Sequence, residues 1–169
     1  LYAWCADTPL KQIGRFLGHE FPELGVVDGI EWTQSYGTGS SRFGFSAGGL
    51  PEPSTTTNTF DSVGVSVYQR YVPDDDEGFA LGTAYQNTWW HGEQDRNLFL
   101  GTLDWKATRE LTLHGSAWID VYGGGDQVKD GAELTELRAS ATQRLGGLSG
   151  VGLTYSHVRW PELLRHEFQ

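Results

Sequence analysis

The chain has 169 residues, a formal net charge of −10 and a single cysteine, Cys5. This length suits one domain or part of one. The negative charge argues against a nucleic-acid partner, because phosphates would be repelled, and one cysteine cannot form an internal disulfide. The absence of methionine and the start at Leu1 indicate a piece of a longer chain or the loss of a leader segment. No apolar run approaches the length of a membrane-spanning helix, but barrel strands give only a weak, alternating signal.

Residue usage favours sheets with tight turns over helices. The chain contains 23 glycines and seven tryptophans, and aromatic residues make up 13% of it. Glycine destabilises helix interiors, whereas aromatic residues are enriched in strands. The first 25 residues are predicted to be irregular or to hold a first strand. Helical spacing is an alternative over residues 8–17, where Thr8 precedes Pro9.

Alternation with a period of two dominates from residue 26 onward. In residues 61–71, for example, Val63, Val65 and Val67 alternate with small polar residues, as expected for a strand with one apolar face. Similar alternation occurs in residues 42–50, 111–122, 135–145 and 151–156. The pattern is less regular in residues 30–36 and 79–90, and the run 98–100 is too short to assign to a face.

The strand count and lengths predict a fold class. Eight or nine strands are expected, many of 10 to 13 residues. Strands that cross a bilayer need about 9–11 residues, whereas strands of soluble sheets usually have about 5–6. The prediction is an all-β, antiparallel up-and-down meander or β-barrel, partial or closed, in a single domain over residues 1–169. The meander covers residues 26–160, and residues 161–169 form a tail in which helical spacing is plausible over 161–168.

Two further patterns are typical of outer-membrane barrels. In a meander, the polar connections at residues 51–60, 91–95 and 123–131 fall at one end, and tighter ones near residues 106–110 and 146–147 fall at the other. The acidic segment 73–77 breaks this rule. Aromatic residues near strand ends suggest an interfacial girdle; they are Tyr71, Trp89, Trp90, Trp105, Trp118, Tyr122, Tyr155 and Trp160.

A resemblance to a known class rests on three short motifs. Ile13–Leu17 contains Gly-Arg, Pro22–Gly29 ends in Asp-Gly, and Arg42–Pro53 reads as a strand followed by a loop. Together they resemble segments of porin-like bacterial outer-membrane β-barrels. The resemblance implies an antiparallel barrel in the outer membrane with a polar interior and no cofactor. Such barrels commonly end on an aromatic residue, whereas this chain ends at Gln169, which suggests a fragment.

No enzyme motif is present in the sequence. The five histidines lack metal-site spacing, and the glycine-rich segment 37–41 lacks the lysine of a phosphate loop. His114 and Asp120 share a strand parity, but about 20 Å of strand separates them. Glu31, Asp104 and Glu136 are conceivable as an acid and a base, although nothing brings them together. The acidic run 74–77 lacks calcium-loop spacing. The chain is therefore expected to be non-catalytic, without cofactor or metal.

The polar faces of the strands hold the candidate site. The residues expected to face a lumen are Arg42, Arg70, His114, Asp120, Glu136, Arg138 and Arg144. The favoured interpretation is a porin-like segment with a role in passive passage or anchoring, in contact with membrane lipid and with small polar solutes. One alternative is a soluble, secreted or periplasmic β-sandwich or jelly roll that binds carbohydrate through Trp32, Trp89 or Trp90, with glycosidase activity as an option. Another is a soluble ligand-binding barrel. The direction of the apolar residues discriminates between them: toward lipid or toward a core.

Overall fold

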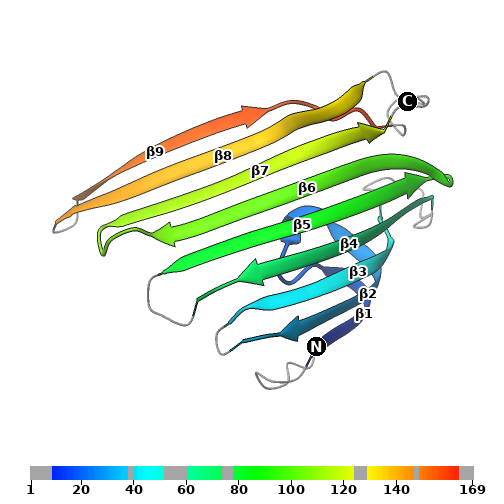
Figure 1. The fold of residues 1–169 in the computed structure, drawn as a ribbon, viewed down its shortest axis with the longest axis horizontal. Helices are drawn as coiled ribbons and strands as arrows, with labels where there is room; N and C mark the ends of the chain where they lie inside the picture. Colours follow the sequence, from blue (N-terminus) through cyan, green and yellow to red (C-terminus); the bar gives the residue numbers. More distant parts are fainter. Residues whose placement is uncertain are drawn as a thin grey trace.

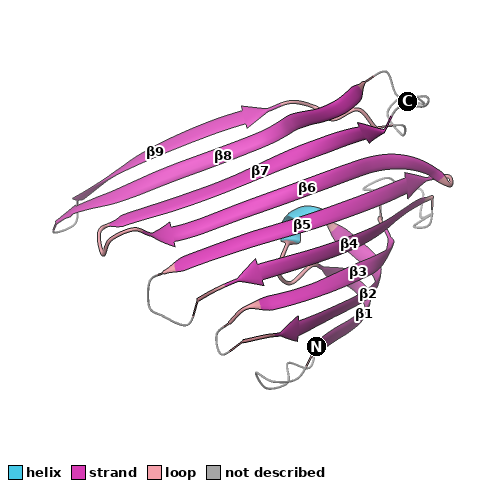
Figure 2. Cartoon of the chain, viewed as in Figure 1, coloured by secondary structure: helices cyan, strands magenta, loops and turns pink. Residues whose placement is uncertain are grey.

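The computed structural model describes residues 9–37, 40–51, 61–73, 78–123, 129–146 and 149–163. They form one antiparallel sheet of nine strands in chain order, so each strand pairs with its sequence neighbour (Figures 1 and 2). The sheet is not closed, because β1 and β9 are its edges. The strands are β1 (Leu10–Leu17), β2 (Val26–Ser35), β3 (Arg42–Gly49), β4 (Ser62–Tyr71), β5 (Phe79–Trp90), β6 (Glu93–Lys106), β7 (Leu111–Gly123), β8 (Asp130–Gly146) and β9 (Ser149–Val158).

The predicted all-β meander is confirmed, and the helical alternative for residues 8–17 is wrong. Leu10–Leu17 forms β1 and pairs with β2 along its whole length, for example Ile13 with Ile30. A run this short fits both the helical period of 3.6 residues and the strand period of two, and its pairing with β2 makes it a strand. The helix that is described is the short 3-10 helix η1 (Pro22–Leu24). Of the tail, residues 161–163 have no regular structure and the rest lies outside the described residues.

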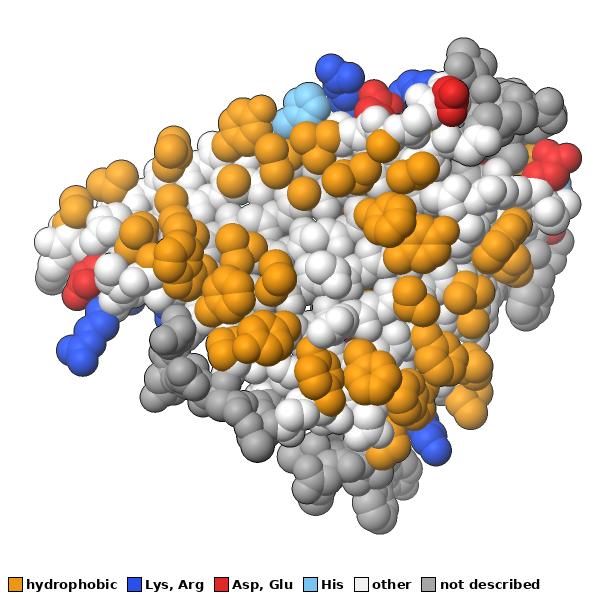
Figure 3. Space-filling view, in the orientation of Figure 1, with side chains coloured by type: hydrophobic (Ala, Val, Ile, Leu, Met, Phe, Trp, Pro, Cys, Tyr) orange, Lys and Arg blue, Asp and Glu red, His pale blue; other side chains and the backbone are white. Residues whose placement is uncertain are grey.

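The two faces of the sheet differ sharply in polarity. Val63, Val65 and Val67 on β4 are 38–50% exposed, whereas Ser62 and Ser66, at the alternate positions of the same strand, are 1–2% exposed. We call the first side the apolar face and the second the polar face. Figure 3 shows hydrophobic side chains spread across the near face of the sheet. The usual arrangement of a soluble one-sided sheet, with apolar side chains covered and polar ones in water, is thus inverted over β4.

The ladder registers place the alternating residues as predicted. Val65 pairs with Ala47, and Val67 pairs with Phe45, on one face. The remaining members of this set follow through the ladders on the same face: Phe43, Val63, Leu137, Ala139 and Ala141. The run 98–100 belongs to β6: Leu98 and Leu100 are buried on the polar face, and Phe99 is 49% exposed on the apolar face.

We call the end of the sheet at which the odd-numbered strands finish the odd end, and the opposite end the even end. In sequence, residues 18–25, 50–61, 91–92 and 124–129 follow odd-numbered strands, and residues 36–41, 72–78, 107–110 and 147–148 follow even-numbered strands. The longest connection is at the odd end, as predicted, but 91–92 has only two residues. The expected loop over 91–95 is therefore wrong, and the predicted difference in loop length is weaker than expected.

A tight turn replaces the expected loop. His91 and Gly92 have φ values of 51° and 88°, as in a type I′ hairpin turn, whose twist matches the flanking strands. Strand β6 then begins at Glu93. The register shifts between Thr88 and Trp89, which leaves Asp95 as an extra residue opposite that step. Strand pairing between β5 and β6 therefore continues through Glu93 and Gln94, although the polar composition of this segment is typical of a loop.

Candidate functional site

The polar face brings together the charged residues singled out in the sequence. Cross-strand pairing places all seven candidates on this face. Arg42 and Arg70 lie directly opposite each other on β3 and β4, an unfavourable pairing of like charges. Each has an acidic partner elsewhere: Arg42 Nη1 lies 2.6 Å from Glu20 Oε1, and Arg70 Nη2 lies 3.4 Å from Asp104 Oδ2. The arginines thereby tie together segments that are distant in sequence.

The most buried ion pair lies toward the odd end. Arg96 on β6 pairs through two hydrogen bonds with Asp120 on β7, which also accepts a hydrogen bond from the Thr135 hydroxyl. The Asp120 side chain is 1% exposed and that of Arg96 is 14% exposed. The Arg96 guanidinium also lies over the Trp118 ring, 5.4 Å from its centroid. Arg96 was not among the predicted residues, because its segment shows no clear alternation.

A more open cluster lies toward the even end. Asp104 on β6 contacts both Arg70 and His114, with His114 Nδ1 2.6 Å from Asp104 Oδ1. The side chains of Asp104 and His114 are about half exposed. On β8, Arg138 Nε lies 2.8 Å from Glu136 Oε1, and the Arg138 side chain is 61% exposed. This part of the polar face is therefore accessible to solvent and to small solutes.

A buried hydrogen-bonded group joins β2 to β4. The Tyr68 hydroxyl donates to Glu31 Oε1 at 2.7 Å and lies 2.6 Å from the Thr33 hydroxyl. The Tyr68 ring reaches β2 across Gly44 on β3, where a Cβ atom would approach the ring to 2.8 Å. Glycine at position 44 thus makes room for the tyrosine.

The segment between β1 and β2 covers part of the polar face. In Figure 1 residues 18–25, with η1, lie behind β4 and β5, on the side opposite the exposed hydrophobic face of Figure 3. Phe21 is 1% exposed, and its ring centroid lies 5.7 Å from that of Tyr68. A Cβ atom at position 82 would lie 2.8 Å from Phe21 Cζ, so the lack of a side chain at Gly82 leaves room for the Phe21 ring. Gln86 Nε2 also donates to the Leu24 carbonyl at 3.1 Å. The segment is thus anchored onto the sheet.

A small apolar cluster surrounds Phe21. Its buried members are Phe21, Tyr68, Ala84 and Leu100, with Leu24 and Trp118 packed against them. The cluster explains why a few apolar residues interrupt an otherwise polar face. Residues 18–25 were not predicted as part of the site, because contacts such as Phe21 with Tyr68 and Leu24 with Gln86 join positions more than 40 residues apart.

Residues after β9 fold back at the odd end. Glu162 accepts a hydrogen bond from the Lys129 backbone, and its own backbone N–H donates to the Tyr122 hydroxyl. Lys129 Nζ lies 2.6 Å from Glu133 Oε2, and this hydrogen bond raises the pKa of Lys129. The lysine therefore remains charged at neutral pH and links β8 to its preceding connection.

The structure does not assemble a catalytic pair from the candidate carboxylates. Glu31 lies on β2, Asp104 on β6 and Glu136 on β8, and these strands are separated by about 10–30 Å at a strand spacing of about 4.8 Å. His114 pairs with Asp104 rather than with Asp120. Among the described residues, no group of three or more His, Cys, Asp or Glu side chains is arranged to hold a metal ion. Cys5 and the acidic run 74–77 lie outside the described residues.

The aromatic residues that the sequence places near strand ends lie on both faces of the sheet. Tyr71 and Trp105 lie at the even end on the apolar face, 42–45% exposed, and Phe43 and Phe79 lie beside them. Trp118 and Tyr122 belong instead to the polar face, where Trp118 packs near Phe21 and Tyr122 is 5% exposed. Their inclusion in the girdle is wrong, because strand parity rather than nearness to a strand end determines their direction.

The search for similar proteins gave no match. No family model, no curated protein and no solved structure matches this chain. No helix within the described ranges has the length and apolar character to span a membrane.

Proposed function

We propose that this chain is a membrane-embedded segment of a porin-like β-barrel of the bacterial outer membrane, with a polar face that lines a passage for small polar solutes. The observation that carries the proposal is the inverted polarity of the sheet. Large hydrophobic side chains are exposed across β1–β9, whereas Glu31, Asp95 and Asp120 are no more than 3% exposed on the strands. Burying the first set in lipid would remove from water an apolar surface that extends over the whole sheet.

Strand lengths support the same proposal. Seven of the nine strands have 10 to 17 residues. Ten residues at about 3.3 Å each, tilted by about 45°, cover about 23 Å along the membrane normal, close to the apolar band of about 25 Å in outer-membrane barrels. The aromatic residues of the even end, Phe43, Tyr71, Phe79 and Trp105, would then lie at one boundary of this band.

The passage is proposed because the polar face combines accessible charges with a fixed covering segment. Asp104, His114 and Arg138 are accessible, whereas residues 18–25 are held on β4 and β5 by Phe21 and Gln86. Mixed charges among serine, threonine and glycine suit a water-filled interior. The soluble sandwich alternative requires a second layer over the apolar face, and the described residues form a single sheet.

The first experiment compares two adjacent positions on opposite faces. Ala139 lies near the middle of β8 on the apolar face and is exposed, whereas its neighbour Ser140 lies on the polar face, away from residues 18–25. Ala139→Arg should destabilise the inserted chain by about 2–4 kcal/mol, the cost of arginine near the bilayer midplane. Ser140→Arg should cost much less.

Insertion is measured by refolding the full chain into phospholipid vesicles and following protection from protease and quenching of tryptophan emission by lipid-borne quenchers. Equal insertion of the two variants, or a wild-type chain that stays monodisperse without detergent and ignores vesicles, contradicts the proposal. Ser66 is not a suitable control, because it is 2% exposed and pairs with Gln86 beneath residues 18–25.

A further inference from the structure

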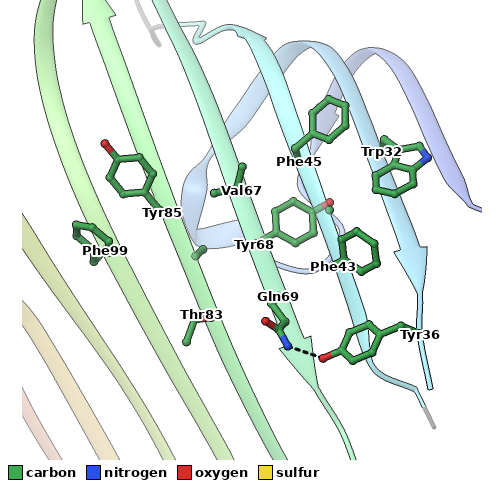
Figure 4. A pocket seen from close by; sticks show the side chains of 12 residues that line it. Trp32, Tyr36, Phe43, Phe45, Val67, Tyr68, Gln69, Thr83, Tyr85 and Phe99 are labelled. Carbon is green, nitrogen blue, oxygen red and sulfur yellow. Dashed lines mark hydrogen bonds between the residues drawn. The ribbon is translucent and has the colours of Figure 1, made fainter. Parts of the chain in front are cut away.

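A groove lies on the apolar face near the even end, between two groups of aromatic side chains. Two aromatic walls bound it (Figure 4). One wall is Trp32 on β2 with Phe43 and Phe45 on β3, whose rings lie 5.4 and 5.9 Å from that of Trp32. The other is Tyr85 on β5 with Phe99 on β6, 4.8 Å apart. The groove has a volume of about 870 Å³.

The floor of the groove is made of smaller side chains. Val67 on β4 and Thr83 on β5 lie between the walls in Figure 4. The walls on β3 and β5 stand two strand spacings apart, which is about 10 Å. A groove of this width runs along the strands and has room for hydrocarbon chains lying parallel to them.

The chemistry of the lining is apolar with a polar end. None of the twelve lining residues is charged. At the even end, Gln69 Nε2 donates to the Tyr36 hydroxyl at 2.6 Å. Beside the wall, Lys11 on β1 lies directly opposite Trp32 in the ladder, hence on the same face, and is exposed. A hydrogen-bonded pair of polar side chains thus lies at the even end of the apolar groove, and the cation of Lys11 lies on the far side of the Trp32 wall.

We propose that this groove binds a phospholipid, with its acyl chains between the aromatic walls and its phosphate beside Lys11. The inference rests on the proposed function, because it requires the apolar face to meet a bilayer. The positive charge of Lys11 complements a phosphate, and the uncharged lining complements acyl chains. A second copy of the chain fits less well, because a two-fold interface would place one concave groove against another.

The test measures phospholipid retained by the full chain after extraction from vesicles of phosphatidylglycerol and phosphatidylcholine. Native mass spectrometry counts the lipids bound to each chain. Thr83→Trp fills the floor of the groove, and Ala139→Trp adds the same ring to the apolar face outside it. Retention should fall by about fivefold or more in the first variant, the change that corresponds to about 1 kcal/mol, and should stay at the wild-type value in the second.

Lysine variants test the site of the phosphate. Lys11→Gln should reduce the preference for phosphatidylglycerol over phosphatidylcholine by up to about fivefold, the effect of one exposed ion pair. Lys106→Gln, which removes an even-end lysine on the polar face, should leave the preference unchanged. If Thr83→Trp does not fold, Phe99→Ala, which removes part of one wall without adding volume, should weaken retention in its place.

The failures of the two proposals are distinguishable. A wild-type chain that inserts into vesicles but retains no phospholipid, or that retains equal amounts in the Thr83→Trp and Ala139→Trp variants, overturns the groove alone. Loss of chemical cross-links between chains in Thr83→Trp, without loss of lipid, identifies a second copy as the occupant and also overturns it. A chain that does not insert at all overturns the proposed function and the groove with it.

Discussion

At the scale of single residues, burial decides which charges matter to stability. Asp120 and Arg96 are largely removed from solvent and bind each other and Thr135, whereas Arg138 is mostly exposed beside Glu136. Breaking a buried pair leaves an uncompensated charge, but a solvated pair contributes little. The same face therefore contains both structural charges and charges that are available to solutes.

Replacing Asp120 should separate these two roles. Asp120→Asn removes the charge that balances Arg96 and should lower the free energy of unfolding by about 3–5 kcal/mol. Arg138→Ala should change it by no more than about 1 kcal/mol. Urea titration of the folded chain, followed by tryptophan emission, measures both values. Equal effects of the two substitutions would show that Asp120 is not a structural charge.

At the scale of elements, residues 18–25 depart from a simple meander, because they fold over the polar face of the sheet instead of joining β1 to β2 directly. This segment leaves the sheet after β1, covers β4 and β5 on the polar face and returns to β2. Its attachment depends chiefly on Phe21, seated between Tyr68 and Gly82. Since Phe21 makes contacts far from its own strand, its removal should release the segment while leaving the neighbouring ladders intact.

Phe21→Ala is predicted to expose the segment to protease. Truncating a buried phenylalanine costs about 3–5 kcal/mol, enough to favour an undocked segment over the docked one. Limited proteolysis should then cut near residues 18–25, and circular dichroism should keep its strand signal. Phe79→Ala, on the apolar face, should leave the segment protected. If the segment stays protected in Phe21→Ala, then Arg42 and Gln86 hold it without the ring.

The sequence predicts elements well where the pattern is local. Period-two alternation over Val63, Val65 and Val67 assigns both the strand and its faces, because successive side chains must point to opposite sides. The turn at His91 was missed since polar composition resembles a loop, whereas ladder pairing with β5 extends β6 through it. The position of the Phe21 side chain could not be predicted, because it depends on contacts with Gly82 and Tyr68, which only the folded sheet brings close to Phe21.

At the scale of the whole molecule, protection should decrease from the middle of the sheet toward its edges. Strand β5 has ladder partners on both sides, and residues 18–25 lie over its polar face. The residues of β9 are exposed on both faces, apart from half-buried His157. Because exchange requires local opening, elements with few covering contacts open most often.

Hydrogen exchange should follow this gradient. Amides of β5 are expected to exchange slowest, and those of β9 and β1 fastest, when the chain is held in detergent or lipid and analysed by mass spectrometry. Val151→Thr, on the open edge strand, should leave the rates in β5 unchanged. Equal protection of β9 and β5 would mean that another strand covers the β9 edge under those conditions.

The nine-stranded order also constrains how this sheet can be completed. Strands that alternate in direction form an antiparallel ring only when their number is even, and with nine strands β1 and β9 point the same way. Joining these two edges directly would make a parallel seam. An all-antiparallel ring therefore needs an odd number of additional strands, whose first and last members both run opposite to β1 and β9. This rule of parity applies whether those strands come from the same polypeptide or from another.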